Sequence, residues 1–153
     1  MSIEVAVFNA HRRRRAGSAR LAEIVRRVLR RERRGSARIA VVLIGESAMA
    51  RMNRTFLGHR GSTDVISFPL GAGANLEGEI YVNLDRAAGQ AREYSVSAAS
   101  ELARLVIHGT LHLAGYDDRS AVKARRMKAK EDRYVEDVMR QVRQQGHHER
   151  KSG

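Results

Sequence analysis

The amino-acid sequence predicts an α+β fold, in which a single domain holds one mixed β-sheet of about four strands with helices packed on it. Three observations lead to this prediction. The length of 153 residues suits one domain, and 42% of the residues are apolar, which is enough for a packed core. Apolar residues alternate in some short segments and recur every three or four positions in others. In chain order, these segments predict strand, helix, strand, helix, two strands and three helices.

The first strand and the first helix follow from two different periodicities. Ile3, Val5 and Val7 alternate with less apolar residues, which indicates a strand. Residues 17–34 predict an amphipathic helix that ends at Gly35. The apolar stripe of this helix consists of Leu21, Ile24, Val25, Val28 and Leu29. Its opposite face is rich in arginine.

The middle of the chain predicts three strands and one helix. Residues 38–44 (RIAVVLI) form a nearly continuous β-branched run, which is typical of a central strand. Residues 47–57 predict a helix, and residues 65–68 predict a strand that Pro69 ends. Residues 79–84 (EIYVNL) predict the last strand.

The C-terminal part of the chain predicts helices. Asp85 is expected to cap a short helix, and Ser97 is expected to cap a long one. A last helix is predicted over residues 120–145, so that the domain spans 1–145. The polar residues 146–153 predict a disordered basic tail.

The composition excludes several classes of protein. The chain has no cysteine, which excludes a disulfide scaffold, a thiolate metal site and a cysteine nucleophile. No apolar run approaches the ~20 residues of a membrane span. At the N-terminus the positive charge follows the apolar stretch, which is the reverse of a signal peptide. We therefore expect a cytoplasmic protein with no membrane partner.

The charge balance favours a polyanionic partner. Lys and Arg number 29 against 17 Asp and Glu, which gives a formal net charge of +12. Such an excess suits nucleic acid, because neutralising phosphates releases counterions. The alternative is an excess that serves solubility or reflects a codon bias toward arginine. Aromatic residues make up only 5% of the chain, so a base-stacking platform is not expected.

The segment 101–119 (ELARLVIHGTLHLAGYDDR) carries the strongest chemical pattern. His108 and His112 lie four residues apart, so a helix projects them from one face, one turn apart. Gly115 allows the chain to turn back, which brings Asp118 within reach as a third ligand. Two imidazoles and a carboxylate leave the fourth position of a catalytic zinc site for water. The pattern predicts one zinc site at the end of a central helix.

Three alternatives stay open on the spacing. A histidine pair four residues apart is by itself often a surface coincidence or a core pair. Asp117 could compete with Asp118 for the metal. The spacing also resembles the zinc motif of metzincin proteases, but those carry a glutamate base directly after the first histidine, where this chain has Gly109. A metallopeptidase is therefore the second interpretation.

Three sequence blocks resemble the YbeY family of bacterial endoribonucleases that mature rRNA. They are residues 53–69 (NRTFLGHRGSTDVISFP), 78–82 (GEIYV) and 108–118 (HGTLHLAGYDD). The resemblance implies an α+β fold, one zinc ion per chain and a cytoplasmic location. It also implies single-strand-specific, zinc-dependent cleavage of RNA in late 16S rRNA 3′-end maturation, ribosome biogenesis and ribosome quality control. The implied partner is rRNA in the small ribosomal subunit.

The chain departs from the family pattern at two positions. The third ligand is usually histidine, where this chain has Asp118, and the resemblance gives Asp117 a supporting role. Leu57 stands where the family has an arginine that contacts RNA phosphate, and Arg60 or Arg54 is the candidate replacement. Both arginines could equally be ordinary solvated residues. This loss keeps a third hypothesis open, in which the protein is a non-catalytic, zinc-containing ribosome-assembly factor.

Other residues near the motif carry weaker expectations. Asp64 is expected to cap a turn or pair with an arginine. Glu101 lies about 10 Å from His108 along the helix axis, which is too far to orient a ligand. Tyr116 is expected to pack under the return loop. The sequence identifies no general base and no oligomeric state.

Overall fold

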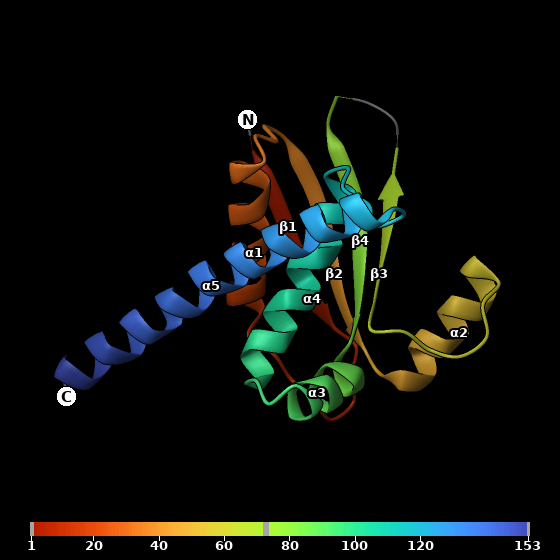
Figure 1. Cartoon of the computed structure of the whole chain (residues 1–153). Coiled ribbons are helices and arrows are strands. Elements are labelled where there is room, and N and C mark those ends of the chain that lie inside the picture. Colours follow the sequence, from red (N-terminus) through yellow and green to blue (C-terminus); the bar gives the residue numbers. More distant parts are fainter. Residues whose placement is uncertain (1, 72–73, 153) are drawn as a thin grey trace.

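The computed structural model describes residues 2–71 and 74–152, with side chains described as far as residue 145 (Figure 1). Four strands and five helices occur within these residues, in the order that the sequence predicts. They are β1 (Ile3–Asn9), α1 (Ser18–Arg31), β2 (Ala37–Ile44), α2 (Glu46–Leu57), β3 (Val65–Leu70), β4 (Leu76–Asn83), α3 (Leu84–Glu93), α4 (Ala98–Leu113) and α5 (Ala121–Ser152). The α+β prediction is confirmed.

The four strands form one mixed sheet with the order β1-β2-β4-β3. Strands β1, β2 and β4 run parallel, whereas β3 pairs with β4 in the antiparallel direction. The β3–β4 pair is the hairpin expected from two consecutive strands, and the parallel pairs are connected through helices. Strand β3 is therefore an edge of the sheet.

The two faces of the sheet are covered unequally. Helices α1, α4 and α5 pack on one face and form the main core with the inward residues of the strands (Figure 1). Helix α2 packs on part of the other face, where Met49 contacts a small cluster around Ile44 and Ile66. Helix α4 is the central helix, because it contacts α1 and α5 as well as strands β3 and β4.

Glycine at two positions lets the end of α4 lie close to the sheet. A Cβ atom on Gly109 would lie 2.7 Å from Cγ2 of Ile80 and 3.0 Å from Oγ of Ser67. A Cβ atom on Gly78 would lie 2.7 Å from a methyl group of Leu113. The Ser67 hydroxyl donates a hydrogen bond of 2.9 Å to the carbonyl of Gly109. These contacts set the distance between β3 and the end of α4 that carries the histidines.

The structure corrects the expected end of the third strand. Pro69 lies inside β3 rather than ending it, and it pairs with Gly78 of β4. An edge strand has a free side along which a missing N–H group costs no ladder hydrogen bond. The proline is therefore tolerated in β3 because that strand is an edge.

The structure also corrects the expected cap of α3. Asn83, not Asp85, is the N-cap residue, and its side chain accepts hydrogen bonds from the amides of Asp85 and Arg86. Asp85 instead accepts a hydrogen bond of 2.9 Å from the amide of Glu46 at the start of α2. It also lies 2.9 Å from Nε2 of His11. Ser97 caps α4 as predicted, accepting from the amide of Ser100.

The last helix is longer than the sequence predicts. Helix α5 continues to Ser152, over residues where the sequence predicts a disordered tail. Gly146 costs a helix only about 1 kcal/mol relative to alanine, and the neighbouring Gln, Glu, Arg and Lys are good helix formers. Within the described residues, no helix combines the length and the apolar character that a membrane crossing requires.

Candidate metal centre

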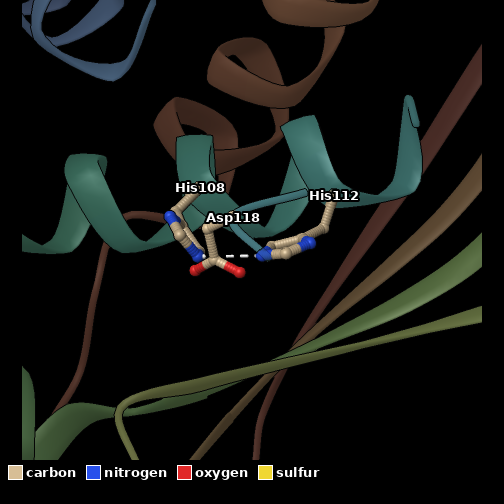
Figure 2. A group of neighbouring side chains, drawn as sticks. All are labelled: His108, His112 and Asp118. Atoms are coloured by element: carbon tan, nitrogen blue, oxygen red, sulfur yellow. Dashed lines mark hydrogen bonds between the residues drawn. The ribbon is translucent and has the colours of Figure 1, made fainter. Parts of the chain in front are cut away.

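Two histidines meet at the C-terminal end of α4. The Nε2 atoms of His108 and His112 are 3.1 Å apart, and the ring centroids are 4.7 Å apart. Figure 2 shows both rings projecting from the same side of the helix. Both side chains are half-buried, because α4 is packed on its other sides. The predicted convergence of the two histidines is therefore present.

A return loop follows the helix and begins with a left-handed residue. Gly115 has a φ of 107°, which glycine adopts at little cost. Its amide donates to the carbonyl of His112, and the amide of Tyr116 donates to the carbonyl of Leu111. This pair of hydrogen bonds is a Schellman motif, which ends the helix and reverses the chain. The glycine therefore has the role that the spacing predicts.

The return loop brings Asp118, rather than Asp117, to the histidines. One donor atom from each of His108, His112 and Asp118 lies within 4.8 Å of the others, and Figure 2 shows the carboxylate beside both rings. Asp117 accepts hydrogen bonds from the amide of Arg119 at 3.0 Å and from Nζ of Lys123 at 3.4 Å. These bonds hold Asp117 within the loop and lower its carboxyl pKa.

The return loop is tied to the core through Glu32, at the C-terminal end of α1. The hydroxyl of Tyr116 donates to Glu32 at 2.6 Å and so anchors the loop, while the side chain of Tyr116 packs against the main core. Tyr134 and Lys130 of α5 also donate to this carboxylate. Burial raises the pKa of Glu32, but the bonds from Tyr116, Tyr134 and Lys130 outweigh it and leave the pKa below its ordinary value.

Glu131 of α5 is a site residue that the sequence reasoning missed. Its carboxylate lies 3.1 Å from Nδ1 of His108, and its side chain is 12% exposed. The signal in the sequence is a carboxylate within the apolar stripe of α5, which includes Met127 and Tyr134. A charged residue in such a stripe requires a partner, because an unpaired buried charge is costly. That partner is on α4, which periodicity alone does not reveal.

The two histidines differ in their electrostatic surroundings. Burial opposes protonation of His108, but the hydrogen bond and charge of Glu131 outweigh it and raise the pKa of the imidazole. Burial and the neighbouring charge of His108 lower the pKa of His112. His112 is therefore the imidazole that more readily offers a lone pair at neutral pH.

A cleft of about 440 Å³ opens beside the histidines. Strand β3 forms one wall with Val65, Ser67 and Pro69, while the return loop forms the other. Arg119 also lines this cleft, although the sequence analysis did not single it out. It is the arginine that directly follows Asp118, so its position in the loop would have been the available signal.

Arg54 and Arg60 are exposed and are not among the residues that line the cleft. Arg54 lies on α2, and Arg60 follows that helix.

Asp64 caps the start of β3, where it accepts a hydrogen bond of 2.8 Å from the amide of Val65. Glu101 is 4% exposed, and burial raises the pKa of its carboxyl.

By its fold and by the donor atoms gathered at the end of α4, this is an α+β protein with a site able to hold a metal ion. The family described as Endoribonuclease YbeY matches residues 7–139, which includes all three donor residues. The chain belongs to the YbeY family.

Individual relatives agree with this assignment. A protein from Chlorobium luteolum named Endoribonuclease YbeY is 42% identical over 128 residues, which cover 84% of this chain and 93% of the relative. A protein of the same name from Salinibacter ruber is 33% identical over 144 residues, covering 88% of this chain and 92% of that protein. A solution structure from Thermotoga maritima has a TM-score of 0.62 and 30% identity, covering 94% of this chain and 93% of that one.

Proposed function

We propose that this protein is a zinc-dependent, single-strand-specific endoribonuclease of the cytoplasm, acting in late 16S rRNA 3′-end maturation, ribosome biogenesis and ribosome quality control. The observation that carries the proposal is the donor set of His108, His112 and Asp118 beside an open cleft. The relatives named as endoribonucleases support RNA as the substrate. The net charge of +12 suits an RNA partner, and we propose the small ribosomal subunit as its source.

The donor set fits zinc. Two nitrogen ligands and a carboxylate oxygen are common in catalytic zinc sites that keep a position for water. Nitrogens bound to a tetrahedral zinc lie ~3.3 Å apart, given bonds of about 2.0–2.1 Å. The two Nε2 atoms are 3.1 Å apart in the structure, which is close to that separation. When bound, zinc would supply Lewis-acid chemistry toward a phosphodiester.

The protein's own residues prepare the site for that chemistry. His112 has a lowered pKa and so presents a neutral imidazole near pH 7. The return loop holds the Asp118 carboxylate beside the two histidines, and Arg119, which lines the cleft, is suited to contact an RNA phosphate. Arg54 and Arg60 would contact RNA only where it extends beyond the cleft.

The position of Gly109 disfavours a metallopeptidase. A glutamate base would have to stand there, yet even a Cβ atom would lie 2.7 Å from Cγ2 of Ile80. A side chain at this position would also meet Ser67 and Val65 of β3. A non-catalytic assembly factor is the remaining alternative, favoured by the exposed Leu57 at the place of the family's arginine.

One experiment separates the three functions. Purified protein of measured zinc content is incubated with a 16S rRNA precursor and, separately, with casein, beside an Asp118→Ala variant. We expect zinc-dependent cleavage of the RNA alone, and a loss of at least about 100-fold in the variant. Cleavage of casein would support the peptidase. Zinc and RNA binding without cleavage would support the assembly factor.

A further inference from the structure

We propose that Glu131 is a positioning residue that presets His108 as a metal ligand. The inference rests on the proposed function, because it concerns how this chain prepares the proposed metal centre. Glu131 lies on α5, whereas both histidines lie on α4, so the contact joins two helices. It is also separate from the motif that predicted the site.

The geometry decides which nitrogen of the neutral His108 ring carries the hydrogen. An ionised carboxylate only accepts hydrogen bonds, so the contact of 3.1 Å with Glu131 places a hydrogen on Nδ1. In the neutral ring this leaves the lone pair on Nε2. Nε2 is the atom that lies 3.1 Å from His112 and within the donor cluster. Glu131 therefore selects the tautomer that faces the proposed metal position.

Glu131 also restrains the orientation of the ring. Glu131, taken as a whole residue, is 9% exposed. Its neighbours Met127 and Tyr134 on the inner face of α5 are buried. With Nδ1 held 3.1 Å from this carboxylate, the ring cannot rotate its Nε2 atom away from His112 without losing that contact. In many metal sites a ligating histidine donates its other ring N–H to a carboxylate in this way, and the hydrogen bond orients the ligand.

Two other roles for Glu131 fit the contacts less well. A direct ligand would have to lie on the Nε2 side of His108, whereas Glu131 lies on the Nδ1 side. If Glu131 only joined the two helices, an apolar residue would serve equally well, because burying an ion pair seldom adds net stability. The second basic group near Glu131 is Arg104, at 3.9 Å, but it lies closer to Asp132, at 2.8 Å.

Asp132 provides a matched control for the test. It adjoins Glu131 on α5 and pairs with the same Arg104, but its side chain is about half exposed. The variants are Glu131→Ala, Glu131→Gln and Asp132→Asn, each checked for folding by thermal unfolding of the metal-free protein. Glu131→Gln preserves the shape of the side chain, so it stays informative if the alanine variant fails to fold.

The first readout is zinc affinity, measured by competition with a chromophoric chelator. We expect about a 10- to 100-fold loss for Glu131→Ala, a smaller loss for Glu131→Gln, and less than about a threefold change for Asp132→Asn. A purely structural role predicts a lower unfolding temperature with unchanged zinc affinity in all three folded variants. That result would overturn the proposal.

The second readout is the imidazole proton signal of the zinc-loaded protein in ¹H–¹⁵N NMR spectra. The wild type should show a protected Nδ1–H signal for His108, and Glu131→Ala should lose it through exchange with water. A protected signal that survives in Glu131→Ala would also contradict the proposal. A wild-type chain that binds no zinc would overturn the proposed function together with this inference, whereas zinc binding that is insensitive to Glu131 would overturn this inference alone.

Discussion

The candidate metal centre is built from two regions that are held in different ways. His108 and His112 lie on α4, whose inner residues, including Val106, Ile107 and Leu111, are almost completely buried. Asp118 lies on an exposed loop that a Schellman motif and the bond from Tyr116 to Glu32 hold in place. The helix therefore preorganises two donors, while the loop adds the third through a few contacts.

This difference predicts where a substitution would disturb the fold and where it would not. Replacing a residue in the close contact between α4 and the sheet disturbs the core, as the 2.7 Å approach at Gly109 shows. Exchanging the third donor alters only a solvent-exposed loop position. Aspartate and histidine both ligate zinc, so position 118 lies in the region that can accept either residue type.

The largest expected effect comes from removing a donor of the helix. His112→Ala should lower zinc affinity by at least about 100-fold, because two remaining ligands hold zinc poorly. Elemental analysis after gel filtration measures this. His59→Ala, which removes an exposed loop histidine, is the control and should keep one zinc per chain. Equal zinc content in the two variants would show that His112 of the helix is not a zinc ligand.

Removing the donor of the loop should have a smaller effect. Asp118→Asn should lower zinc affinity about 10- to 100-fold, because a neutral amide oxygen is a poorer ligand than a carboxylate. Asp118→His should keep the metal. Asp117→Asn should change the affinity less than about threefold, because Asp117 is bonded to Arg119 and Lys123. Competition titration of the three variants checks the order, and a reversed order for the two asparagine variants would make Asp117 the ligand.

Loosening the loop without removing a donor should have a still smaller effect. Tyr116→Phe deletes the hydrogen bond of the loop to Glu32, which is worth about 1 kcal/mol, and should weaken zinc binding a few-fold. Tyr134→Phe deletes a bond to the same carboxylate from α5 and serves as the control. Both should lower the unfolding temperature, but only Tyr116→Phe should affect zinc affinity. Equal losses of zinc affinity in the two variants would contradict this account. They would show that the bond from the loop to Glu32 matters no more to the metal centre than the bond from α5.

The smallest effect on the metal centre is expected from Asp85, a carboxylate on α3 that lies outside both α4 and the return loop. The amide of Glu46 leads the interactions that lower the pKa of Asp85 to about 2, with His11 and Arg14 contributing. A pKa depressed in the folded state stabilises the protein above the unfolded value of 3.8, and this stability is lost as the pH falls from about 4 to 2.

Asp85→Asn tests this separation. The Asp85 side chain is 37% exposed, so solvent screening reduces its contribution to about 1 kcal/mol at pH 7. Denaturant unfolding of the metal-free protein should show this loss at pH 7 and a flatter dependence between pH 4 and 2. Zinc affinity at pH 7 should equal that of the wild type, and a marked fall would connect this junction to the metal centre.

The sequence predicts those features that depend on local patterns. Alternation and helical periodicity give the order of the elements found in the described part of the chain, and the spacing predicts His108, His112 and Asp118, with Asp117 as the alternative, as the donors that come together. Gly115 marks the helix end, because a left-handed residue is needed there. Such features require only neighbours in the chain.

Features that depend on distant contacts could not be predicted in the same way. Pro69 lies within β3 because the sheet order makes that strand an edge, which no local pattern reveals. Glu131 meets His108 only through the packing of α5 on α4. Arg54 and Arg60 seemed suited to replace a missing phosphate contact, yet Arg119 is the arginine that lines the cleft.

The most direct test of the two-region metal centre is anomalous diffraction from crystals of the zinc-loaded protein, recorded at the zinc absorption edge. We predict one anomalous peak between Nε2 of His108, Nε2 of His112 and the carboxylate of Asp118. A zinc-loaded crystal with no peak at this position, or with the peak at Asp117, would contradict the account.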